Sequence, residues 1–138
     1  MRLQFHIDGG DFVNAGKASS AVKRVLKQLD VSAKKIKRVI IALYETEVNV
    51  VAHANGGDID VVVDPDNIKL TVRDSGPGIP DIKQAMTEGF STASRAVREM
   101  GFGAGMGLAN IKRNSDSFQI ESVPGKGTTV TIINELKD

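Results

Sequence analysis

Residues 58–74 read Asp-Ile-Asp-Val-Val-Val-Asp-Pro-Asp-Asn-Ile-Lys-Leu-Thr-Val-Arg-Asp, and this stretch decides the fold. Apolar side chains recur at every second position on both sides of the polar segment 64–67, at Ile59, Val61, Val63, Ile68, Leu70 and Val72. A period of two is typical of a half-buried strand, and a short polar segment with proline between two such runs is typical of a turn. The stretch therefore predicts a β-hairpin.

The segments on either side of this hairpin show the same two kinds of periodicity. In order, they predict a strand over 3–7, helices over 15–29 and from Ser32 to about 54, the hairpin, a short helix over 81–86, a helix over 107–114, and a second hairpin with strands 118–123 and 128–133. Strands that occur mostly as hairpins favour an antiparallel sheet. We therefore expect an α+β fold, a two-layer sandwich of a mostly antiparallel sheet with helices on one face.

Composition narrows the class of protein. The chain has 138 residues, which suits a single domain over 1–138, and it contains no cysteine, so thiolate metal sites and disulfides are excluded. The formal net charge of +1 favours neither nucleic acid nor an anionic membrane as a partner. The longest apolar run, 39–44, is far shorter than a membrane span, and the start of the chain does not resemble a signal peptide. A cytoplasmic protein is the expectation.

The second predicted helix carries a row of polar residues. Glu45, Asn49 and His53 are spaced four apart, so they stack on one helix face, away from the apolar stripe that includes Val39 and Leu43. This spacing alone is compatible with a solvated face. It is also compatible with a metal-phosphate face, because carboxylate and amide oxygens suit Mg²⁺, which takes few protein ligands and several phosphate or water oxygens.

Two glycine-rich segments follow the first hairpin. Asp74-Ser-Gly76-Pro-Gly78-Ile comes directly after a strand, where a carboxylate can accept a hydrogen bond and glycines allow close backbone approach to a ligand. The segment 101–107, Gly-Phe-Gly-Ala-Gly-Met-Gly, opens a predicted helix, where free backbone N–H groups favour phosphate. Neither the P-loop nor the dinucleotide-binding pattern fits this segment. A third segment, Gly-Lys-Gly-Thr-Thr over 125–129, predicts a hairpin turn.

The order and spacing of these boxes resemble the GHKL ATPase superfamily. Glu-x-x-x-Asn on a helix, Asp-x-Gly-x-Gly after a strand, Gly-x-Gly-x-Gly before a helix and Gly-x-Gly-Thr in the last hairpin occur in the order of its Bergerat ATP-binding fold. Within that group the chain is similar to small anti-sigma-factor serine kinases and switch kinases (RsbW-like and RsbT-like), nearest to the switch-kinase branch. Residues 45–54, Glu-Gly-Phe-Ser-Thr over 88–92, and the segment from 105 onward carry this closer similarity.

The resemblance implies a role for each matching residue. Glu45 corresponds to the catalytic general base, and Asn49 to the ligand of Mg²⁺. Asp74 corresponds to the carboxylate that reads the adenine of ATP. The other residues that correspond to the nucleotide site are His53, Gly76, Gly78, Gly103, Gly105, Met106, Gly107 and Thr128. An ATP lid is expected at about 87–105.

The same resemblance implies a function and a class of partner. It implies an ATP-dependent protein serine/threonine kinase that phosphorylates a STAS-type antagonist protein in a partner-switching pathway. A sigma factor, a phosphatase regulator and a second copy of the chain are further partners that it allows. Two alternatives stay open: a non-catalytic ATP-sensing module that sequesters a partner, and a detached histidine-kinase ATP domain. Eight basic residues between 17 and 38 are compatible with a solvated helix surface or with a protein-docking face.

Overall fold

The computed structural model describes residues 1–53, 56–75, 107–123 and 125–137. Its elements are β1 (Arg2–Asp8), the 3-10 helix η1 (Phe12–Asn14), α1 (Lys17–Gln28), α2 (Ala33–His53), β2 (Gly56–Val63), β3 (Asn67–Asp74), α5 (Gly107–Arg113), β4 (Ser117–Val123) and β5 (Gly127–Glu135). The predicted order of strands and helices is confirmed over these ranges. The expected short helix at 81–86 and the lid at 87–105 lie outside the described residues.

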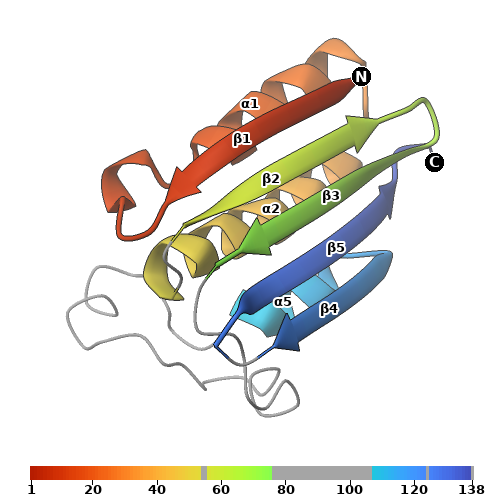
Figure 1. The fold of residues 1–138 in the computed structure, drawn as a ribbon. Helices are drawn as coiled ribbons and strands as arrows, with labels where there is room; N and C mark the ends of the chain where they lie inside the picture. Colours follow the sequence, from red (N-terminus) through yellow and green to blue (C-terminus); the bar gives the residue numbers. More distant parts are fainter. Residues whose placement is uncertain (54–55, 76–106, 124, 138) are drawn as a thin grey trace.

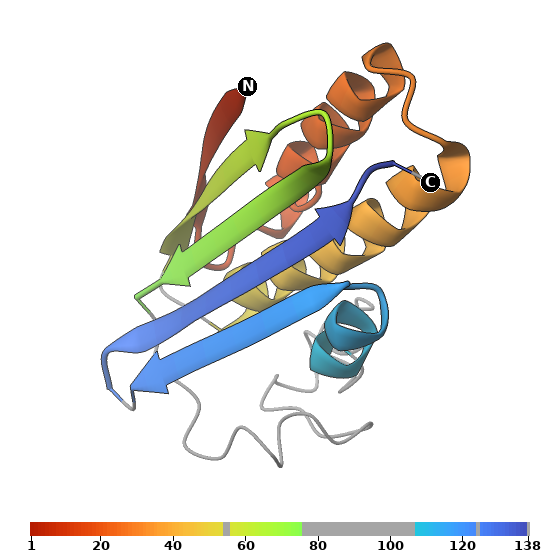
Figure 2. The same ribbon diagram turned by 90° about the vertical axis from the view of Figure 1, so that its right-hand side faces the viewer.

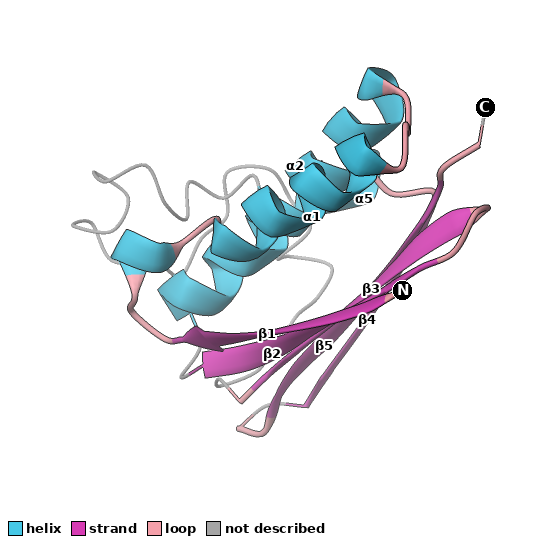
Figure 3. Ribbon diagram, turned by 90° about the horizontal axis from the view of Figure 1, so that it is seen from above, coloured by secondary structure: helices cyan, strands magenta, loops and turns pink. Residues whose placement is uncertain are grey.

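The strands form one sheet in the order β1-β2-β3-β5-β4, and every neighbouring pair is antiparallel. Figure 1 shows the two hairpins side by side, with β5 between β3 and β4. The helices of the described ranges all lie on one face of the sheet, as seen from above in Figure 3. The expected α+β sandwich is therefore confirmed.

The alternation in residues 58–74 places one side of the first hairpin in the core. Ile59, Val61, Ile68 and Leu70 are at most 1% exposed, and they face the helix layer. α2 lies between the other two helices, with α1 toward the β1 edge of the sheet and α5 beside β4 (Figure 2). α2 is therefore packed against α1, α5 and the sheet. Among the described residues, no helix is long and apolar enough to cross a membrane.

α1 begins later than its apolar spacing predicts, at Lys17 instead of residue 15. The residue before it, Gly16, has a φ of +96°, which is a left-handed conformation that L side chains rarely adopt. A helix cannot extend back through such a residue. α2 begins after Ser32 as expected, with the Lys35 N–H donating to Ser32 Oγ at 3.4 Å.

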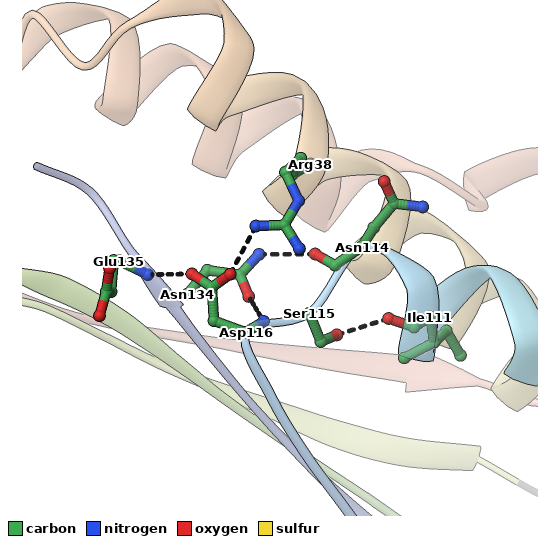
Figure 4. Close-up of polar contacts among 7 residues, drawn as sticks. All are labelled: Arg38, Ile111, Asn114, Ser115, Asp116, Asn134 and Glu135. Carbon is green, nitrogen blue, oxygen red and sulfur yellow. Dashed lines mark hydrogen bonds and ion pairs between the residues drawn. The ribbon is translucent and has the colours of Figure 1, made fainter. Parts of the chain in front are cut away.

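A polar cluster ties α2, α5 and β5 together at one end of the sheet (Figure 4). Arg38 of α2 forms an ion pair with Asp116, which lies between α5 and β4 and directly precedes Ser117 of β4. The buried Asn134 of β5 accepts from the Asp116 N–H at 2.7 Å and donates to the Asn114 carbonyl at 2.9 Å. The C-terminal end of α5 therefore lies near Arg38, in the first third of α2, and α5 packs along α2 in the antiparallel direction. The beginning of α5, Gly107, is therefore directed toward the C-terminal half of α2.

This cluster predicts a pH-dependent contribution to stability. The Arg38 guanidinium holds the pKa of Asp116 below its ordinary value of 3.8, helped by the Glu135 N–H. A lowered carboxyl pKa stabilises the fold above the unfolded-state value, and the gain is lost as pH falls through the folded-state value. We expect Asp116→Asn to lower the free energy of unfolding by about 0.5–1 kcal/mol at pH 7, since the pair is partly exposed. Urea unfolding of both proteins should give converging stabilities below about pH 3; a constant difference would contradict this assignment.

Candidate functional site

The C-terminal half of α2 presents the predicted acid–amide pair. Glu45 and Asn49 are one helical turn apart, and both are half-buried. The residues around them in the helix, Thr46 and Val50, are buried. The two side chains therefore lie on a partly exposed strip of the helix, beside positions that are packed in the core. Within the described residues, no hydrogen bond joins either side chain to another residue.

A second pair of predicted residues meets where β3 ends and β5 begins. Asp74 and Thr128 are cross-strand partners, and the Thr128 N–H donates to Asp74 Oδ1 at 3.1 Å. The Thr128 hydroxyl lies 2.9 Å from the Ser122 hydroxyl of β4, and Thr128 is only 7% exposed. The carboxylate of Asp74 is thus fixed by the neighbouring strand. The structure thus brings together the second and the fourth of the four motifs, Asp-x-Gly-x-Gly and Gly-x-Gly-Thr, through their residues Asp74 and Thr128.

Glycines in β2 and β5 allow the backbones of these strands to lie close to the backbone around Asp74. A Cβ on Gly57, the cross-strand partner of Asp74 in β2, would lie 2.5 Å from the Arg73 carbonyl oxygen and 3.2 Å from Val50 Cγ1. Val50 follows Asn49 in α2, so this half of α2 packs against the sheet beside Asp74. Figure 1 shows the end of α2, the end of β3 and the start of β5 at the same end of the molecule.

Gly127 offers a direct test of this close approach. A Cβ at residue 127 would lie 2.1 Å from the Asp74 carbonyl oxygen, and the φ of +135° already disfavours a side chain. We expect Gly127→Ala to lower the free energy of unfolding by about 3 kcal/mol, because backbone must shift as well as adopt a strained conformation. Gly125→Ala is the matched control: its φ is +81°, but nothing lies within 4 Å. It should cost about 1 kcal/mol, from strain alone. Equal losses by thermal or urea unfolding would contradict the predicted clash.

The remaining predicted residues are placed only in part. His53 is the last residue of α2, and its side chain is outside the described part of the chain. Gly107 is the first residue of α5, as the glycine pattern predicts. Gly76, Gly78, Gly103, Gly105 and Met106 lie outside the described residues, so their assignment stays a prediction.

Sequence reasoning missed Glu47, a residue between Glu45 and Asn49. Its side chain is 2% exposed, and its carboxylate accepts hydrogen bonds from four donors at the start of α1. These are the N–H groups of Gly16 (2.9 Å), Ala18 (3.2 Å) and Ser19 (3.2 Å), and the Ser19 hydroxyl (2.8 Å). Helix N-termini leave such N–H groups without partners, and no side chain of the N-cap residue satisfies them here. Glu47 therefore caps α1 from another helix.

A signal for Glu47 was present in the apolar stripe. Stepping by four from Val39 and Leu43 reaches Glu47, so a charged residue stands where the helix pattern calls for a core residue. A buried carboxylate needs hydrogen-bond donors. The residue before Lys17 is a glycine, which has no side chain to cap α1, so the N–H groups at the start of that helix need another acceptor.

The donor set of the site fits Mg²⁺ and a nucleotide. In the described ranges, no cluster of three or more His, Asp or Glu side chains could hold a metal ion. Asn49 and Glu45 instead offer hard oxygen atoms on one helix face, which suits an ion that takes most of its ligands from phosphate and water. Asp74, held by Thr128, offers a carboxylate at the other side of the same end of the molecule.

Comparison with protein families finds one match that covers most of the chain. Residues 34–138 match the family described as histidine kinase-, DNA gyrase B-, and HSP90-like ATPase. Among curated proteins, the chain is 34% identical over 119 residues to the serine/threonine-protein kinase RsbT of Bacillus subtilis, covering 83% of this chain and 84% of that protein. It is 30% identical over 137 residues to an anti-sigma F factor of Geobacillus stearothermophilus, covering 94% of this chain and 90% of that protein.

Solved structures agree with the fold. A Mycobacterium tuberculosis protein with RsbU and RsbW domains superposes with a TM-score of 0.61 at 19% identity, covering 97% of this chain and 32% of that one. The mycobacterial sensor histidine kinase MprB superposes with a TM-score of 0.53 at 17% identity, covering 98% of this chain and 97% of that one. At these identities the likeness concerns the fold alone.

Proposed function

The chain belongs to the histidine kinase-, DNA gyrase B- and HSP90-like ATPase family, and on that premise we propose that it is an ATP-dependent protein serine/threonine kinase of the anti-sigma-factor and switch-kinase type. Its substrate would be a serine or threonine hydroxyl on a STAS-type antagonist protein. The names of the curated relatives, a serine/threonine kinase and an anti-sigma factor, support a role in partner switching.

One observation carries the proposal: Glu45 and Asn49 share a helix face at the end of the molecule where Asp74 is anchored. Asn49 and Asp74 alone would suffice for a protein that only senses ATP. A protein that transfers phosphate also needs a group to accept a proton, and a carboxylate one turn from the metal ligand can serve that purpose. The presence of both Glu45 and Asn49 therefore favours an enzyme over a sensor.

Three residues of the chain would have separate roles in the reaction: one binds the metal ion, one binds adenine and one accepts a proton. Asn49 would hold Mg²⁺ through its amide oxygen, and the bound ion would neutralise charge on the phosphates of ATP. Asp74, oriented by the Thr128 N–H, would accept a hydrogen bond from the exocyclic amine of adenine. Glu45 would accept the proton of the acceptor hydroxyl as that oxygen bonds to the γ-phosphorus. The bond from the γ-phosphorus to the β–γ bridging oxygen would break, and ADP would leave.

Phosphate transfer to a candidate partner tests the proposal. The full chain is incubated with Mg²⁺, ATP carrying ³²P at the γ-phosphate, and a STAS-domain protein encoded beside its gene. Acid-stable label on the STAS protein supports a serine/threonine kinase, since phosphoserine and phosphothreonine survive acid. Acid-labile label would instead indicate a histidine-kinase ATP domain. ATP binding without transfer would indicate the sensing module and overturn the proposal.

A further inference from the structure

An open groove of about 630 Å³ lies between the first half of α1 and the middle of α2. It is a different place from the end of the molecule where Asp74 and Thr128 meet. Its lining includes Lys17, Lys23 and Arg24 from α1, and Ile40 and Tyr44 from α2. Tyr44 is 41% exposed, which is unusual for a large aromatic side chain in a helix layer. The groove therefore combines a cationic wall with an apolar one.

The positive charge of the groove is part of a wider segregation of charge. Eight basic residues lie between 15 and 44, against one acidic residue, Asp30, although the whole chain carries only +1. Of these eight, Arg38 is paired with Asp116. Within the part of the chain that the structure describes, no ion pair neutralises the exposed Lys17, Lys23 or Arg24. A concave surface with one sign of charge attracts ligands of the opposite sign.

Contacts between α1 and α2 hold one side of the groove in place. A Cβ on Gly16 would lie 3.2 Å from Tyr44 Cε2, so the Tyr44 ring occupies the space that any side chain at residue 16 would fill. Gly16 and Ser19, which line the groove, also donate to the buried carboxylate of Glu47. These contacts hold the start of α1 against α2, so the backbone of this part of the groove does not have to be ordered when a ligand binds.

We propose that this groove is a docking site for an acidic, amphipathic segment of a partner protein. Carboxylates of the segment would pair with Lys17, Lys23 and Arg24, while an apolar side chain would pack on Tyr44 and Ile40. Charge complementarity supports this occupant. Nucleic acid fits less well, because a single aromatic side chain provides no series of stacking platforms. A membrane fits less well, because the apolar residues line a hollow instead of a protruding face.

The identity of the partner as a substrate or antagonist of the kinase rests on the proposed function. Tyr44, which lines the groove, directly precedes Glu45, the proposed general base. Glu47, two residues further on, accepts a hydrogen bond from Gly16, which also lines the groove. A segment docked here would bring its protein next to the half of α2 that carries Glu45. Binding to the groove needs no ATP, so it can be measured independently of catalysis.

An NMR titration of the ¹⁵N-labelled full chain without ATP tests the docking site. The probe is a helical peptide of about twelve residues with glutamate on one face and leucine on the other, a common arrangement for helix-in-groove ligands. The control peptide has glutamine in place of glutamate. We expect the amide signals of Gly16, Ser20 and Tyr44 to shift with the glutamate peptide and to stay in place with the glutamine peptide.

Matched charge reversals locate the binding. A Lys23→Glu/Arg24→Glu variant should bind the glutamate peptide about tenfold more weakly or worse. A Lys34→Glu/Lys37→Glu variant makes the same change in net charge outside the groove and should keep its affinity within about twofold. Urea unfolding verifies that both variants fold.

Four outcomes would overturn the proposal. These are equal weakening in the two variants, equal binding of the two peptides, absence of binding at about 1 mM peptide, and larger shifts of the same amides with phosphatidylglycerol vesicles or duplex DNA. The phosphate-transfer assay is unaffected by any of them, so failure of the groove and failure of the kinase activity are distinguishable.

Discussion

A Glu45→Ala variant is expected to bind ATP with nearly unchanged affinity and to transfer phosphate about 100- to 10,000-fold more slowly. The reason is that a general base acts on the proton of the acceptor hydroxyl, which has no counterpart in nucleotide binding. Glu45 is half-buried at the surface of α2, so its removal should leave the free energy of unfolding within about 0.5 kcal/mol of the wild-type value.

Single-turnover phosphate transfer and ATP binding by calorimetry measure the two effects. Asn49→Ala is the matched comparison one turn away: it should weaken the binding of ATP in the presence of Mg²⁺, because it removes the proposed metal ligand. If Glu45→Ala bound ATP normally and transferred phosphate at the wild-type rate, Glu45 would not be the base. If both variants lost only transfer, the assignment of Asn49 to the metal would be wrong.

A Glu47→Ala variant should lose stability, which Glu45→Ala should keep: we expect its free energy of unfolding to fall by about 3 kcal/mol or more. The substitution leaves three N–H groups at the start of α1 and the Ser19 hydroxyl without their acceptor, in a region where Glu47 is 2% exposed. A domain of this kind is stable by only about 5–15 kcal/mol, so this is a large fraction.

Urea unfolding measures this loss, and Glu47→Gln is its control. Glutamine keeps one acceptor oxygen but places an NH₂ group against donors, so it should recover part of the stability and remain less stable than wild type. A Glu47→Ala protein as stable as wild type would contradict the capping role. Two carboxylates two residues apart on one helix would thus have different roles: Glu45 in the proposed reaction, and Glu47 in holding α1 against α2.

The strands and helices of this fold could be predicted because the apolar periodicity that indicates each one lies within the element itself. The alternation at Ile59, Val61 and Val63 and the stripe at Val39 and Leu43 are read from neighbouring residues, and the strands and helices follow them. The short η1 was missed, since three residues are too few to show a period. The order of the strands was not predicted either, because pairing between β3 and β5 depends on residues far apart in the chain.

In the candidate site too, the residues could be predicted from local motifs, while the contacts between distant residues could not. The motifs indicated Glu45, Asn49, Asp74 and Thr128, and the structure adds that Asp74 and Thr128 are hydrogen-bonded cross-strand partners. Glu47 was missed because its partners, 28 to 31 positions away, belong to another helix. A charged residue in an apolar stripe indicates that donors must exist, but the sequence does not say where they are.

The insertion of β5 between β3 and β4 has a consequence for how the chain reaches its native state. β3 pairs with β2 as soon as the first hairpin forms, but its other edge stays bare until β5, whose Thr128 lies 54 positions after Asp74, inserts beside it. Pairing over such a separation is slow, and a bare edge invites pairing with other chains. The growing chain on a ribosome would therefore pass through an aggregation-prone interval, in which the Asp74 carboxylate still lacks the Thr128 N–H of β5 that orients it.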